Sequence, residues 1–202
     1  MQWLPTSALT TDPSPPVPVH IFTLGRFDLL INGVLLQFEG RGPRRPLELL
    51  AALVAAGPRG SSVGALADQL WPDAEGFDAY RALITTLHRL RRLLVHRQAI
   101  HFGAGRLRID PAVCCVDAWK FEHLLSAARN REELVSALAL YRGPFLADDE
   151  SAWALGTRAR LEQAVARVTR RLWSASAVHE ERSPRWSGVM APADLDAVGV
   201  AI

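Results

Sequence analysis

Acidic residues are missing from one long stretch of this 202-residue chain. Between Ala79 and Ile109 the sequence places seven arginines and no aspartate or glutamate, although the formal net charge of the whole chain is only +2. Lysine is scarce throughout, because Lys120 is the only one among the 23 basic residues. The total charge therefore says little about partners, whereas its distribution indicates a local surface for an anionic partner.

Cysteine is scarce in this sequence, and long apolar runs and the pattern of a secretory leader are lacking. The only cysteines, Cys114 and Cys115, are adjacent and cannot form a disulfide without severe strain, so we expect a reducing, cytoplasmic location. The longest uncharged apolar run, 49–57, is far shorter than the roughly 20 residues of a membrane helix, and no membrane partner is expected. Residues 1–18 contain five prolines and no basic segment followed by an apolar one. They are predicted to form a flexible, proline-rich leader.

Patterns typical of catalysis, cofactors and metals are missing as well. The six histidines show no metal-ligand spacing, so we predict neither a metal site nor a bound cofactor. Consecutive carboxylates occur at 148–150, but three neighbours in sequence do not converge on one reacting atom. We therefore expect that the protein is not an enzyme and has no catalytic residues.

The N-terminal part predicts strands and then two helices. Alternating apolar residues at 27–31 and 34–38 flank Asn32-Gly33, a dipeptide typical of β-hairpins. An apolar stripe with helical spacing then begins near Pro46 and ends at Gly57-Pro58. The next stripe runs from Val63 to Trp71 and is preceded by Ser61 and Ser62, either of which can cap a helix. The expected order is hairpin, first helix, second helix.

A third helix, 78–94, carries most of the arginines. Leu83, Leu87, Leu90 and Leu94 recur at i, i+4, i+7 and i+11 and predict a buried stripe, with Asp78 as the expected N-cap. The opposite face repeats this spacing in polar residues, with two further arginines at its flanks. These residues are Arg81, Thr85, His88 and Arg92, flanked by Arg89 and Arg91.

A second hairpin is predicted after this helix. Two short strands within 99–109 flank a Gly-Ala-Gly turn and carry Arg106 and Arg108. Hairpin, three helices and hairpin is the order of a winged helix, whose third helix enters the major groove and whose last hairpin is the wing. We therefore predict an α+β winged helix at 19–113 that recognises duplex DNA with helix 78–94 and wing 99–109.

The rest of the chain is predicted to be helical and short. After a connection from Pro111, apolar stripes within 116–173 indicate a small all-α domain, and breaker residues at 174–202 predict an irregular tail. About three helices leave the outer apolar side of the last one uncovered, so we expect this half to self-associate as a homodimer.

For the arginine-bearing face of helix 78–94, the alternative to DNA binding is a charged face that is simply solvated, as most runs of charged residues are.

Six segments then occur in a characteristic order. They are Ile21-Phe-Thr-Leu-Gly-Arg-Phe27, Gly42-Pro-Arg-Arg-Pro-Leu-Glu-Leu-Leu50, Ala67-Asp-Gln-Leu-Trp-Pro-Asp73, Thr85-Thr-Leu-His-Arg-Leu-Arg-Arg-Leu-Leu94, Val116-Asp-Ala-Trp-Lys-Phe-Glu122 and Tyr141-Arg-Gly-Pro-Phe-Leu146. With them the chain resembles transcription regulators of the bacterial transcriptional activator (BTAD) family. In that family an OmpR/PhoB-like winged helix precedes a helical, tetratricopeptide-like activator domain. By comparison, we expect the activator domain of this chain to be truncated.

The resemblance implies roles for individual residues and partners. It implies DNA contacts for Arg81, Thr85, His88, Arg89, Arg91 and Arg92, and support of the wing by Arg106. Arg108 is added as a DNA-binding residue from its place on the predicted wing. RNA polymerase or another regulator is the partner expected for the helical half. The alternative function is a protein-interaction module in which the winged helix no longer binds DNA.

Overall fold

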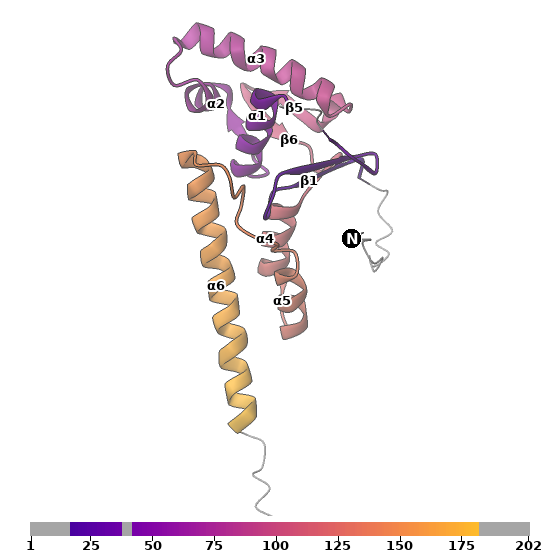
Figure 1. The fold of residues 1–202 in the computed structure, drawn as a ribbon, viewed down its shortest axis with the longest axis vertical. Helices are drawn as coiled ribbons and strands as arrows, with labels where there is room; N and C mark the ends of the chain where they lie inside the picture. Colours follow the sequence, from indigo (N-terminus) through magenta and orange to yellow (C-terminus); the bar gives the residue numbers. More distant parts are fainter. Residues whose placement is uncertain (1–16, 38–41, 182–202) are drawn as a thin grey trace, which may run out of the picture.

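The computed structural model describes residues 17–37 and 42–181. Residues 1–16 of the predicted leader, and residues 182–202 of the predicted irregular tail, lie outside the described part of the chain. Figure 1 shows α3 across one end of the molecule, the sheets and shorter helices beneath it, and α6 running away from it.

Four strands form the first sheet. They are β1 (Val19–Phe22), β2 (Asp28–Ile31), β3 (Val34–Leu35) and β7 (Cys114–Val116), in the order β3-β2-β1-β7. The predicted hairpin is confirmed: Asn32 and Gly33 have φ of 51° and 81°, the left-handed values that a two-residue turn requires. The residues of β7 were expected to form an irregular connection, but they form a strand that pairs in parallel with β1. Val19 and Cys114 are opposite each other in this pair.

Three helices follow the first three strands. They are α1 (Arg44–Ala55), α2 (Val63–Leu70) and α3 (Gly76–Leu93). The predicted cap at Ser62 is confirmed, because its hydroxyl accepts a hydrogen bond from the Ala65 amide. The predicted cap at Asp78 is wrong: α3 begins two residues earlier, and Asp78 lies in its first turn. An acid there still offsets the positive end of the helix dipole.

The second hairpin belongs to a three-stranded sheet. After the short 3-10 helix η1 (Arg97–Ala99), β5 (Ile100–Gly103) and β6 (Arg106–Ile109) pair as predicted. The third strand, β4 (Ser61–Ser62), pairs with β6 and was not foreseen. It is reached through Gly60, where a Cβ would lie 2.0 Å from the Leu107 carbonyl oxygen and φ is +64°. Glycine therefore permits the close approach that joins this sheet to α1 and α2.

The helical half contains α4 (Asp117–Ala127), α5 (Arg131–Leu138) and α6 (Ala152–Glu181). The prediction that an irregular tail begins at residue 174 is wrong for its first eight residues, because α6 continues through them. Three helices were expected and three are present in the described residues. Helix α6 extends well beyond the rest of the fold (Figure 1).

One hydrophobic core joins the two halves. Side chains from both halves are fully buried in one cluster. The cluster includes Phe121 of α4, Phe145 of the segment before α6, and Leu161 of α6, together with side chains of β1, α1 and α3. The indole N–H of Trp119 donates to the carbonyl oxygen of Val54 at 2.9 Å, which ties α4 to the end of α1. The predicted boundary near residue 116 is therefore a change in fold type without a break in packing.

Asp117 fastens the start of α4 to the end of β1. Its carboxylate accepts hydrogen bonds from the Thr23 amide at 2.8 and 2.9 Å, the Thr23 hydroxyl at 2.7 Å and the Leu24 amide at 3.0 Å. Thr23 is fully buried, so these donors have no access to water. A charged acceptor that satisfies several buried donors is a strong, specific link between distant segments.

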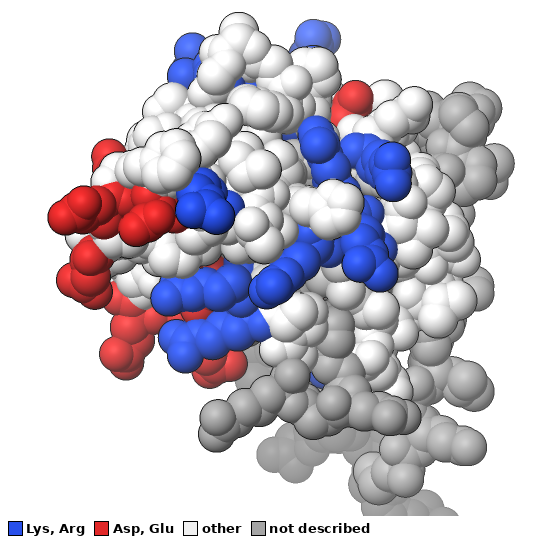
Figure 2. Space-filling model, turned by 90° about the horizontal axis from the view of Figure 1, so that it is seen from above, with Lys and Arg blue, Asp and Glu red and all other residues white. Residues whose placement is uncertain are grey.

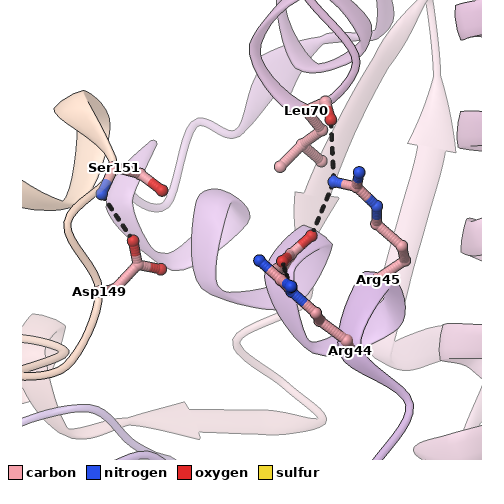
Figure 3. A network of polar contacts seen from close by, with 6 residues as sticks. Arg44, Arg45, Leu70, Asp149 and Ser151 are labelled. Atoms are coloured by element: carbon pink, nitrogen blue, oxygen red, sulfur yellow. Dashed lines mark hydrogen bonds and ion pairs between the residues drawn. The ribbon is translucent and has the colours of Figure 1, made fainter.

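Polar contacts also hold the segment before α6 and the first turn of α1. The Arg158 guanidinium binds the carbonyl oxygens of Phe145, Leu146 and Asp149, and Asp149 accepts from the Ser151 amide. On the facing helix, Arg45 bridges Glu48 and the Leu70 carbonyl oxygen, as Figure 3 shows. These hydrogen bonds fix the conformation of residues 145–151 and of the first turn of α1.

We predict that Asp117→Ala lowers the free energy of unfolding by about 3 kcal/mol, because it leaves buried donors of Thr23 and Leu24 without an acceptor. Glu122→Gln is the control, since it removes the exposed ion pair with Arg160 and should cost less than about 1 kcal/mol. Urea denaturation of both variants measures the difference. Equal midpoints for Asp117→Ala and the unmodified chain would contradict this role.

Candidate nucleic-acid interface

The rotation of α3 about its axis is fixed by its buried residues. Leu83, Leu87 and Leu90 are at most 3% exposed, and Leu94 just after the helix is fully buried. They pack against α1 and α2, as the predicted leucine stripe requires. The opposite side of the helix is consequently turned to solvent.

The predicted polar face of α3 is exposed. Among residues 17–37 and 42–181, no salt bridge within 4.0 Å involves any arginine of this face. Unpaired guanidinium groups on one helix face form an anion-binding surface, because each carries five donors in a planar fork. The exposed residues are Arg81, Thr85, His88, Arg89 and Arg92.

Arg91 has a structural contact that the sequence did not predict. Its side chain is half-buried, and Nε and Nη2 donate to the Ile100 carbonyl oxygen at 3.3 and 2.9 Å. The physical reason is its position directly after Leu90, about 100° around the helix from the buried stripe and facing β5. Arg91 therefore holds the β5–β6 hairpin against α3, and its donors are directed to the protein backbone.

The hairpin arginines alternate with buried residues along β6. Leu107 and Ile109 are fully buried, so Arg106 and Arg108 point outward. Arg106 Nη2 donates to the Gly60 carbonyl oxygen at 2.9 Å, in line with the support role that the resemblance implies. Arg108 is exposed and lies opposite His101 in the strand pair.

Charge is separated along this side of the molecule. Figure 2, which looks down on the α3 side, shows basic side chains across the middle and acidic ones gathered at the left edge. Exposed acids occur before and in the first turn of α3, at Asp73, Glu75 and Asp78, and none follows up to residue 109. The basic surface is therefore confined to the rest of α3 and the hairpin.

Two exposed aromatic residues at the start of α3 were missed by the sequence reasoning. Phe77 is 73% exposed and Tyr80 is 44% exposed. The Arg81 guanidinium carbon lies 5.8 Å from the centre of the Phe77 ring, within the range of a cation–π contact. The available signal was the position of Phe77 away from the leucine stripe, because an aromatic residue that misses the buried face of a helix is exposed. Tyr80 continues the spacing of the stripe, so its exposure had no signal in the sequence.

The cysteine side chains are removed from the surface of α3, and Cys114 is buried. Burial, helped by the charges of Asp110 and Cys115, raises the pKa of the Cys114 thiol to about 12, so this thiol stays neutral. Among the described residues there is no group of three His, Cys, Asp or Glu side chains able to hold a metal ion. Across the same residues, no helix is long and apolar enough to cross a membrane.

Comparison with known proteins identifies the helical half. Residues 116–190 match the family model described as bacterial transcriptional activator domain. The chain carries a BTAD domain. The resemblance seen in the sequence is thereby confirmed, and the matched region begins at Val116, the last residue of β7, and includes α4, α5 and α6.

One solved structure is similar in fold to most of this chain. It is EmbR of Mycobacterium tuberculosis in complex with a low-affinity phosphopeptide, with a TM-score of 0.57 and 23% identity. The match covers 81% of this chain and 48% of that one, so this chain spans about half of EmbR's length. Comparison with curated protein sequences gives no match.

Neighbouring arginines at the end of α3 should behave differently. Because Arg91 holds the Ile100 carbonyl oxygen, Arg91→Gln should lower the free energy of unfolding by about 1 to 2 kcal/mol. Arg92→Gln is the matched control, since Arg92 is exposed and its loss should change stability by less than about 0.5 kcal/mol. Thermal unfolding of the two variants compares them directly. Equal melting temperatures would show that Arg91 does not support the hairpin.

Proposed function

We propose that this protein is a transcription regulator that binds duplex DNA with α3 and the β5–β6 hairpin. The observation that carries the proposal is the exposed face of α3, in which Arg81, Arg89 and Arg92 have no acidic partner. A salt-bridged surface helix pairs such charges with acids at i±3 or i±4. Arg89 and Arg92 have no acid at those positions, and Asp78, three residues before Arg81, forms no salt bridge with it. The presence of a BTAD domain and the likeness to EmbR support this function.

The dimensions of α3 suit a major groove. Its 18 residues span about 27 Å, and a helix with side chains is about as wide as the groove of B-DNA. In this arrangement the sheet-and-helix half is a winged helix, α3 is its recognition helix and the β5–β6 hairpin is its wing. Arg108 then reaches the DNA backbone, while Arg91 and Arg106 keep the wing in place.

The helical half is assigned to protein contacts. A BTAD domain next to a DNA-binding face suits recruitment of RNA polymerase or another regulator, and its helices form a short tetratricopeptide-like unit. Exposed apolar side chains occur on α5 and α6, where Val135 is 50%, Leu155 is 46% and Trp173 is 75% exposed. Self-association through this half stays a prediction.

Charge reversal on α3 tests the DNA-binding role. Arg89→Glu combined with Arg92→Glu should weaken binding to a duplex by a factor of about 100 or more, because two charge-assisted contacts are replaced by repulsion. The control is Arg167→Glu with Arg170→Glu, which has the same spacing and charge change on the exposed side of α6. It should bind DNA nearly as tightly as the unmodified chain.

The measurement is fluorescence anisotropy of a labelled duplex, with circular dichroism to check folding. The α3 variant should keep its helical signal, since both arginines point away from the core. Equal loss of binding in the two double variants would mean that net charge alone attracts DNA. Unchanged binding in the α3 variant would contradict the proposed interface.

A further inference from the structure

Apolar side chains lie within the cationic face of α3. Phe77, Arg81, Ile84 and His88 recur at i, i+4, i+7 and i+11 and therefore share one side of the helix. Phe77 is 73% exposed, and Ile84 is half-buried, with part of its side chain packed against the core. Ile84 lies between Arg81 and His88 along the helix, on the side nearer the β5–β6 hairpin, so a ligand that spans these two residues and the hairpin passes over its exposed part.

An apolar contact has a limited choice of partners on DNA. Phosphates are charged and the base edges of the major groove mostly present hydrogen-bonding groups, whereas the C5-methyl group of thymine is the apolar group that projects farthest into that groove. Exposed apolar groups are stabilised only when such a partner removes them from water. The β-branched side chain of Ile84 is also stiff about χ1, so it presents its methyl groups in one direction.

Phe77 is positioned beside the same contact. Its ring lies 5.8 Å from the Arg81 guanidinium carbon, which holds the ring on the DNA-facing side of α3. Its place in the first turn puts it two turns before Ile84. Apolar groups at this spacing reach different base pairs along a groove.

We propose that Ile84 and Phe77 contact thymine methyl groups, so that the DNA site this protein prefers contains thymine at the positions that face them. The inference rests on the proposed DNA-binding function. It assigns sequence discrimination to two apolar residues, and leaves to Arg89 and Arg92 the contacts that give affinity. A protein partner for the same apolar pair is the competing explanation, and the position of Ile84 between Arg81 and His88 favours DNA.

The test removes the methyl groups from the DNA and leaves the protein unchanged. The full chain is used to select its preferred duplex from random sequences, and each thymine of that site is replaced in turn by deoxyuridine. Uracil keeps every hydrogen-bonding group of thymine and lacks only the methyl. Binding should weaken about fourfold at one or two positions, the factor expected for burial of one methyl-sized group, and stay constant elsewhere.

Protein variants then assign each sensitive thymine to a side chain. Ile84→Ala should bind the thymine and deoxyuridine forms of one position equally, and Phe77→Ala should do so at another. Ile84→Val removes a single methylene and keeps the helix packing if the alanine variant is unstable. The matched control is Val34→Ala, an exposed valine on β3 that should retain the full thymine preference.

The possible results distinguish a failure of the thymine-methyl contact from a failure of the proposed DNA-binding function. Specific DNA binding that is indifferent to every deoxyuridine would overturn the methyl contact and leave the DNA-binding function intact. Failure to bind any duplex would overturn both. If both variants keep the thymine preference but lose self-association measured by sedimentation, the apolar pair is a protein-docking surface and the inference is wrong.

Discussion

Burial of the leucines of α3 is the constraint on which the candidate interface depends. Leu83, Leu87, Leu90 and Leu94 are almost completely removed from water, and each such side chain contributes about 1.5 to 3 kcal/mol. Rotating the helix by half a turn would expose all four and bury several arginines without partners. The sequence therefore permits one orientation, in which the arginine face is outward.

Two further links determine what surrounds that face. Arg91 sets the β5–β6 hairpin beside α3 through a hydrogen bond to Ile100, and Gly60 sets it beside the segment between α1 and α2 through close backbone approach to Leu107. Asp117 and Trp119 join the BTAD domain to β1 and α1, so the two halves share one core. A partner bound to the helical half therefore acts on the same packed body that carries α3.

Periodic features were predictable from the sequence. Both hairpins, all six helices in the described residues and the rotation of α3 follow from local apolar spacing and turn residues such as Asn32-Gly33. Pairings between distant segments were not predictable. Strand β7 is three residues long and pairs with β1 some 95 positions earlier, and β4 has only two residues. Such strands are too short to show a period of their own.

The same distinction applies to individual residues of the site. Exposure of Arg81, Arg89 and Arg92 follows from helical spacing. The hydrogen bond from Arg91 to the Ile100 carbonyl oxygen depends instead on where β5 packs against α3. Phe77 and Tyr80 precede the first leucine of the stripe, so the stripe alone did not draw attention to them. Likewise, the end of α6 was placed too early, because the apolar pattern used to predict this helix ends at Trp173, whereas the helix continues to Glu181.

The salt dependence of DNA binding tests the central claim most directly. Each phosphate neutralised by an arginine releases counterions, so five to eight contacts give a slope of about −4 to −7 for log K against log salt concentration. Fluorescence anisotropy of the full chain with a labelled duplex, between about 50 and 200 mM salt, measures it. A slope in that range supports α3 and the hairpin as a DNA-binding surface. A flat response, or no binding at the lowest salt, would contradict it and favour a protein-interaction module.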